Sequence, residues 1–191
     1  MFTLDANIFV RDVDPREPDH DVCHALIERL RAGGEPIVVP LLILAEIAGS
    51  VSRTRNDPIR ARVFVEIVRD LPSITFMPLD ERLAQAATEL AADYRLRGAD
   101  AVYVAVARQA GTILVTLDEE QRTRAAPVVT VQTPAQALAE LPSPRAESLT
   151  PTSARRAASH RAGAPPGWAR DRAPRPHWRA AETQGCAPAR P

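Results

Sequence analysis

The sequence contains no lysine, because all 24 basic residues among its 191 are arginine. A P-loop nucleotide site needs the lysine of its Gly-Lys-Ser/Thr motif, and Schiff-base chemistry needs a lysine amine. A Gly-x-Ser-x-Gly motif and a glycine-rich phosphate loop are also absent. These absences exclude P-loop enzymes, lysine-dependent enzymes and serine hydrolases of the nucleophile-elbow type.

Cysteines and long apolar runs are scarce as well. The two cysteines, Cys23 and Cys186, lie far apart, so neither a disulfide framework nor a CxxC site is predicted. The longest apolar run, residues 37–45, is interrupted by Pro40 and is too short to cross a bilayer. The first residues lack the basic start and apolar stretch of a secretion signal. We therefore expect a cytoplasmic protein without a membrane segment.

Large aliphatic side chains almost disappear in the last part of the chain. Residues 142–191 hold nine prolines and nine arginines, and Leu149 is their only large aliphatic residue. The charge also changes sign: residues 1–141 carry 15 arginines against 21 acids, and the remainder carries nine against three. Such a segment cannot build a core, so we expect one domain of residues 1–141 and a disordered Pro/Arg/Ala-rich tail.

Short β-branched runs alternate with helical stretches throughout residues 1–141. This alternation predicts an α/β fold in which a central, mainly parallel sheet is flanked by helices. The expected strands are residues 1–4, 37–39, 73–77, 112–117 and 128–131. The expected helices are residues 19–31, 41–53, 58–70, 80–95, 99–110 and 134–141.

Three aspartates are expected at one edge of this sheet. Asp5 follows the first strand and Asp118 follows the strand 112–117, so both lie at carboxyl ends of strands, where open α/β sheets bind ligands. Asp100 opens the helix that leads into the Asp118 strand. A helix packed antiparallel to the strand that follows it starts beside the end of that strand. We therefore expect Asp100 to face Asp118.

Glu46 is the only charged residue in the apolar stretch 36–52. A carboxylate beside so much apolar surface is costly unless it is compensated. Glu46 lies about a turn and a half into its helix, about 8 Å below the sheet edge by the helical rise, and its long side chain can reach that edge. We expect it to join Asp5, Asp100 and Asp118 there.

Each of these acids also has an ordinary structural explanation. Asp5 could begin an Asx turn, and Asp100 is a favourable acid in the first turn of a helix. Asp118 with Gln121 fits a capping box, and Glu46 could lie on a solvated strip of its helix. These explanations suffice for the residues taken singly. The convergence of four acids on one edge favours a shared site.

Clustered carboxylates repel one another, and without counterions some of them would bind protons. A divalent cation relieves the repulsion, and oxygen ligands without histidine or cysteine suit Mg²⁺ or Mn²⁺ rather than zinc. Such an ion can polarise a phosphoryl oxygen and lower the pKa of a water molecule that attacks a phosphodiester. The pattern favours a metal-assisted nuclease.

Four segments carry a resemblance to a known family: residues 4–9 (LDANIF), 45–47 (AEI), 97–107 (RGADAVYVAVA) and 114–118 (LVTLD). In this order and spacing they resemble PIN-domain ribonucleases, most closely the VapC-like toxins of type II toxin–antitoxin systems. The resemblance covers residues 1–141. The Pro- and Arg-rich tail departs from the family, whose chains end soon after the last helix.

The resemblance implies a three-layer α/β/α fold that cleaves RNA with Mg²⁺ or Mn²⁺. It also implies a cognate antitoxin protein that blocks the acidic pocket, and commonly a homodimer. The family's four acidic positions match Asp5, Glu46, Asp100 and Asp118. Of these, Asp5 and Asp100 are the first choices as metal ligands. Asn7 and Thr116 match polar positions that support the site by hydrogen bonding.

Two further groups of side chains have alternative interpretations. His20, Cys23 and His24 have a metal-ligand spacing, but without a third distant ligand an amphipathic helix is the simpler interpretation. Four arginines after the Glu46 helix could contact RNA phosphates or an antitoxin, or could lie on a solvated face; they are Arg53, Arg55, Arg60 and Arg62.

Other functions stay open on the sequence alone. The main alternative is a PIN-like module that binds RNA or a partner protein without cutting, and another is a nuclease that acts on DNA. Glu119 and Glu120 could substitute for Asp118, although solvated acids at a helix start are the preferred interpretation. The tail could be a basic arm that gathers RNA, with Trp168 and Trp178 stacking on bases.

Overall fold

The computed structural model describes residues 1–142, in which eight helices surround a five-stranded sheet. The strands are β1 (Phe2–Leu4), β2 (Ile37–Pro40), β3 (Ile74–Met77), β4 (Ile113–Val115) and β5 (Val131–Gln132). The helices are α1 (Ala6–Asp12), α2 (His20–Gly33), α3 (Ile43–Arg55), α4 (Pro58–Arg69), α5 (Glu81–Tyr94), α6 (Gly98–Ala110), α7 (Glu119–Ala125) and α8 (Pro134–Glu140). The disorder expected for the tail concerns residues 143–191, which lie outside the described residues.

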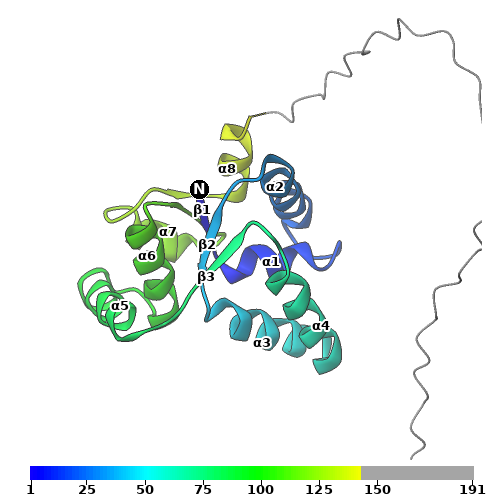
Figure 1. Cartoon of the computed structure of the whole chain (residues 1–191), viewed down its shortest axis with the longest axis horizontal. Helices are drawn as coiled ribbons and strands as arrows, with labels where there is room; N and C mark the ends of the chain where they lie inside the picture. The colour runs from blue at the N-terminus through cyan, green and yellow to red at the C-terminus, as the bar shows by residue number, and fades with distance from the viewer. Residues whose placement is uncertain (143–191) are drawn as a thin grey trace, which may run out of the picture. The chain divides into compact units, whose positions relative to one another are not determined.

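The sheet is wholly parallel, with strand order β3-β2-β1-β4-β5. The chain runs outward from β1 through β2 to β3 and then returns to place β4 on the other side of β1. Parallel crossovers are right-handed, so this reversal puts the connecting helices on opposite faces. Figure 1 shows α1, α2 and α4 on one side of the sheet and α5 and α6 on the other. The prediction of a three-layer α/β/α fold is confirmed.

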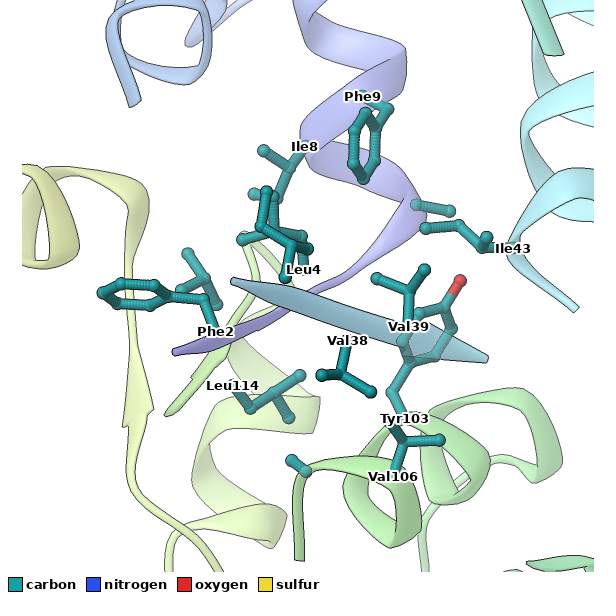
Figure 2. Packing of buried hydrophobic residues seen from close by; sticks show 14 of the residues in the cluster. Phe2, Leu4, Ile8, Phe9, Val38, Val39, Ile43, Tyr103, Val106 and Leu114 are labelled. Atoms are coloured by element: carbon teal, nitrogen blue, oxygen red, sulfur yellow. The ribbon is translucent and has the colours of Figure 1, made fainter. Parts of the chain in front are cut away.

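The central strands are buried on both faces, as a parallel sheet between two helical layers requires. Leu4, Val39 and Leu114 have no exposed surface. Figure 2 shows side chains packed above and below these strands, among them Ile8 and Phe9 from α1 and Val106 from α6. This packing anchors β1 and β4 side by side and thereby fixes the edge at which their carboxyl ends lie.

Several helix boundaries follow directly from capping residues in the sequence. The Asp80 carboxylate accepts a hydrogen bond from the backbone N–H of Leu83 at 2.8 Å, and Thr133 forms a capping box with Gln136. Gly34 and Gly111 end α2 and α6 with φ of 63° and 64°, where a residue without Cβ is unstrained.

Two short helices and one strand position differ from the sequence-based expectation. Helices α1 and α7 have seven residues each and were missing from the predicted helices, although the capping pattern of Asp118 and Gln121 indicated where α7 starts. Strand β5 lies at Val131–Gln132 instead of residues 128–131. The backbone N–H groups of Val128 and Val129 donate to the Ala125 carbonyl and are therefore unavailable to the sheet.

Within residues 1–142, no helix combines the length and the apolar character needed to cross a membrane.

Candidate active site

Asp5 lies directly after β1, at the point where the strand order reverses, and caps α1. Its carboxylate accepts hydrogen bonds from the Thr116 hydroxyl at 2.6 Å and from the Asn7 side-chain amide at 2.7 Å. The buried Thr116 hydroxyl has a single proton, which it gives to Asp5, and it accepts from the Asn7 amide at 3.0 Å and the Asp118 backbone N–H at 3.1 Å. Asn7 and Thr116 therefore hold Asp5 in one orientation and join β1 to the segment after β4.

Asp118 lies three residues after the end of β4 and caps α7. One carboxylate oxygen accepts from the backbone N–H of Gln121 at 3.0 Å, and the other accepts from the Arg97 guanidinium at 3.2 Å. Arg97 also pairs with Glu120 at 2.7 Å, and Glu120 in turn pairs with Arg124 at 2.7 Å. Glu120 is thus committed to surface ion pairs, which agrees with its interpretation as a helix-start acid rather than a replacement for Asp118.

Glu46 lies in the first turn of α3 and is half-buried. The Tyr103 hydroxyl, from a side chain that is 1% exposed, donates a hydrogen bond of 2.5 Å to its carboxylate. Figure 2 shows the Tyr103 hydroxyl directed from α6 toward the region of Ile43, at the start of α3. Burial raises the pKa of Glu46, the Tyr103 hydrogen bond lowers it, and the charge of Asp100 raises it further.

Asp100 lies in the first turn of α6, opposite the carboxyl ends of the strands. Burial raises its pKa to about 6, with further increases from the charges of Asp5 and Asp118 and a decrease from Arg97. No side chain of the described region donates a hydrogen bond to it, so its charge is the least compensated of the four. The effect of the Asp118 charge on the pKa of Asp100 agrees with the expectation that the two side chains face each other.

The four acids lie in one another's electrostatic field although they come from four separate segments. Burial raises the pKa of Asp5 to about 6, against the hydrogen bonds from Thr116 and Asn7, and the charge of Glu46 adds to the increase. In the same way, the charge of Asp100 raises the pKa of Glu46, and the charge of Asp118 raises the pKa of Asp100. The charges of these acids therefore act on one another, and a shared site for all four stays a prediction.

The donor set suits a hard divalent cation, because it consists of carboxylate oxygens without histidine or cysteine. Among residues 1–142, however, no three acidic, histidine or cysteine side chains are placed to hold an ion together. Three of the carboxylates accept hydrogen bonds from side chains of the protein: Asp5 from Thr116, Glu46 from Tyr103 and Asp118 from Arg97. Their raised pKa values show that this compensation is incomplete for Asp5 and Glu46.

The sequence of this domain matches the family model described as PIN domain over residues 2–127. The chain belongs to the PIN domain family. No curated protein matches it.

Several solved structures share the PIN fold. VapC20 of Mycobacterium tuberculosis, described as a sarcin-ricin loop cleaving toxin, is 20% identical over 69% of this chain and 99% of its own, with a TM-score of 0.56. FitAcB of Neisseria gonorrhoeae is 22% identical over 71% and 99%, with a TM-score of 0.55. VapBC2 of Rickettsia felis, bound to a promoter DNA fragment, is 18% identical over 69% and 97%, with a TM-score of 0.54. At these identities the likeness establishes the fold.

Two residues of this PIN domain were not assigned a role from the sequence. Tyr103 and Arg97 were named only as members of the segment 97–107 that carries the family resemblance, yet both bind acids of the candidate site. The sequence feature that could have identified Tyr103 is its spacing from Asp100. Residues three apart in a helix lie on the same face, so Tyr103 and Asp100 share one face of α6. The sequence offered less to identify Arg97, because its contact with Asp118 depends on how the starts of α6 and α7 are placed relative to each other.

The histidine pair on α2 has a structural role in the PIN domain. The rings of His20 and His24 stack at 5.6 Å, and their Nδ1 atoms contact the Arg11 carbonyl at 3.0 Å and the Asp12 carboxylate at 2.7 Å. Cys23 is fully buried in the core. These contacts join α1 to α2 and agree with the interpretation of an amphipathic helix.

Proposed function

We propose that this PIN domain is a metal-dependent endoribonuclease that acts as the toxin of a toxin–antitoxin pair. The observation that carries the proposal is the burial of carboxylates near the reversal point of the sheet, where burial, with a smaller contribution from neighbouring acids, raises the pKa of both Asp5 and Asp100 to about 6. Uncompensated negative charge at a ligand-binding edge favours a divalent cation. The sarcin-ricin loop cleaving activity in the description of VapC20 supports RNA as the substrate.

The four acids have separate parts in this proposal. Asp5 and Asp100 would hold Mg²⁺ or Mn²⁺ most directly, and Glu46 and Asp118 would complete the negative pocket. When bound, such an ion polarises the phosphodiester and assists deprotonation of the attacking water. Asn7 would keep the Asp5 carboxylate oriented toward the pocket.

Partner proteins are part of the same proposal. We infer a cognate antitoxin, since FitAcB and VapBC2 are toxin–antitoxin assemblies, and a homodimer in its absence. An exposed apolar stripe on α4 supports binding to another chain. Its members follow one another at helical spacing of four and are 71%, 56% and 55% exposed: Ile59, Val63 and Ile67.

Cleavage of a structured RNA by wild type and Asp100→Asn tests the enzymatic part. We expect cleavage that needs Mg²⁺ or Mn²⁺, stops with a chelator, and falls at least about a hundredfold in the variant because the least compensated ligand is lost. Glu119→Gln, which removes an exposed acid next to the pocket, is the matched control and should retain activity. A DNA strand of the same sequence, tested under the same metal, separates ribonuclease from deoxyribonuclease.

A PIN-like module that binds RNA or protein without cutting is the second candidate. It is favoured by the absence, within residues 1–142, of three acids placed to hold an ion together. Tight RNA binding that is unchanged in Asp100→Asn, with no turnover under any metal, would select the module. Growth arrest upon expression, relieved by co-expression of the neighbouring small gene, would select the toxin.

A further inference from the structure

A cavity of about 550 Å³ opens between α1 and α3, and Glu46 is the one of the four acids that lines it. Its volume lies within the range of sites that hold small molecules. Asn7 and Glu46 contribute to its lining, so it is continuous with the candidate active site. An RNA strand bound across the carboxylates can therefore continue directly into this cavity.

The arginines in and near the cavity differ in how their charge is compensated. Arg11 forms an ion pair with Glu17, which also lines the cavity. Arg55 is 16% exposed and pairs with the carboxylates of Asp14 and Glu17. Arg53 lines the cavity and has no acidic partner within the described part of the chain. It is therefore available to an anionic ligand.

The position of the Arg53 side chain depends on Gly49, one turn earlier in α3. A Cβ atom at residue 49 would lie 3.1 Å from Nη1 and 3.9 Å from Cζ of Arg53. The guanidinium is thus folded back over the glycine, in the direction in which helical side chains normally point, toward the Glu46 end of α3. Glycine leaves the space that this orientation needs.

The remaining walls suit the other parts of a nucleotide. Ala6 and Val10 from α1 and Ala45 from α3 give apolar surface for a base, and Ser50 adds a hydroxyl that can bind a ribose. A guanidinium binds phosphate through a planar fork of donors. One nucleotide could therefore satisfy the charged, polar and apolar parts of the cavity together.

We propose that Arg53 binds the phosphate of a nucleotide flanking the scissile bond, and that this nucleotide is seated in the cavity between α1 and α3. The inference rests on the proposed ribonuclease function and deepens it. It also divides the arginine cluster seen in the sequence, because Arg55 is neutralised by Asp14 and Glu17 whereas Arg53 is not. The continuity with Asn7 and Glu46 and the apolar walls favour RNA over an acidic segment of an antitoxin.

RNA binding by the full chain tests this inference in an Asp100→Asn background, where cleavage does not interfere. The probe is a short single-stranded RNA of mixed sequence, titrated at several salt concentrations. We expect Arg53→Ala to weaken binding about tenfold and to reduce the slope of log affinity against log salt by about 0.7, the value for one phosphate contact. Arg53→Lys keeps the charge and should retain the slope while losing part of the affinity.

Two further variants distinguish this site from a general effect of charge, the first as a control and the second as a test of the Arg53 side-chain position. Arg62→Ala removes the same charge from an exposed position on α4. It should leave the RNA affinity and its salt dependence close to those of the Asp100→Asn protein. Gly49→Ala requires the guanidinium to move by a few tenths of an ångström, so it should weaken RNA binding less than Arg53→Ala does and cause no loss of thermal stability, since alanine is favourable in helices. Equal effects of Arg53→Ala and Arg62→Ala would overturn the inference.

A scan of the probe with single uncharged methylphosphonate linkages locates the phosphate. We expect one linkage beside the scissile bond to weaken binding by the parent protein and to have no effect with Arg53→Ala, as in a double-mutant cycle. The same scan profile for both proteins would overturn the inference, as would a loss of antitoxin binding in place of RNA binding. Wild type that binds this RNA through Arg53 but never cuts it would contradict only the proposed cleavage.

Discussion

The Tyr103 hydroxyl donates a hydrogen bond of 2.5 Å to the Glu46 carboxylate across the interface of α6 and α3. The phenol ring is buried, and its hydroxyl reaches the only charge in the first turn of an otherwise apolar helix start. A hydrogen bond to a charged group in a low-dielectric surrounding is stronger than one between neutral groups. Tyr103 therefore holds the Glu46 carboxylate against α6.

Replacing Tyr103 by phenylalanine removes this bond and keeps the ring packing. We expect unfolding free energy to fall by about 1 to 2 kcal/mol because a part-buried carboxylate loses its donor. RNA cleavage should fall about tenfold, and Mn²⁺ affinity measured by calorimetry should fall with it, because Glu46 is no longer held in place. Tyr94→Phe on α5 is the matched control. Unchanged Mn²⁺ affinity in Tyr103→Phe would show that the hydroxyl has only a structural role.

The stability of the metal-free protein should depend on pH through Asp5 and Asp100. Their pKa values are raised from 3.8 to about 6 in the folded state, so folding is favoured by proton binding. This contribution is fully present below pH 4 and is lost as the pH rises through about 6. Mg²⁺ or Mn²⁺ should therefore raise the melting temperature more at pH 7.5 than at pH 5, because protons and metal compete for the same carboxylates.

Asp100→Asn removes one of these charges and should make the metal-free protein more stable at pH 7.5, by about 1 to 2 kcal/mol after allowance for solvent screening. The pH dependence of melting should flatten, and the stabilisation by Mn²⁺ should shrink. Asp93→Asn, at an exposed position of α5, is the control and should leave a curve parallel to wild type. A lower melting temperature for Asp100→Asn at pH 7.5 would contradict the electrostatic account.

The apolar stripe on α4 predicts an interaction surface. Val63→Glu places a charge in the middle of the stripe, where the side chain is 56% exposed, so the monomer should fold and melt as wild type does. We expect a shift toward monomer in light scattering or weaker co-purification with the antitoxin, since burial of a charge against apolar surface is costly. Thr88→Glu, exposed on α5 on the opposite face of the sheet, is the control. If Val63→Glu changes neither association, partners bind elsewhere.

The different surroundings of Arg53 and Arg55 illustrate what sequence patterns cannot predict. Both lie in the last turn of α3 and look equivalent along the chain. Only the fold brings Asp14 and Glu17, from the segment between α1 and α2, against Arg55 and leaves Arg53 at the cavity. In the same way, α1 and α7 could not be predicted from periodicity, because seven residues hold too few turns to show it.

The sequence by itself determined the α/β class, most strand and helix positions, and the edge at which the acids gather. Local patterns suffice for these, because burial imposes a period on each element and strand ends follow from chain order. Asp5 and Asp118 cap α1 and α7 and are also acids of the proposed site, so their ordinary and functional interpretations are compatible. Tertiary structure alone decided which donor each carboxylate meets, because Thr116, Tyr103 and Arg97 reach their partners across 21 to 111 residues of chain.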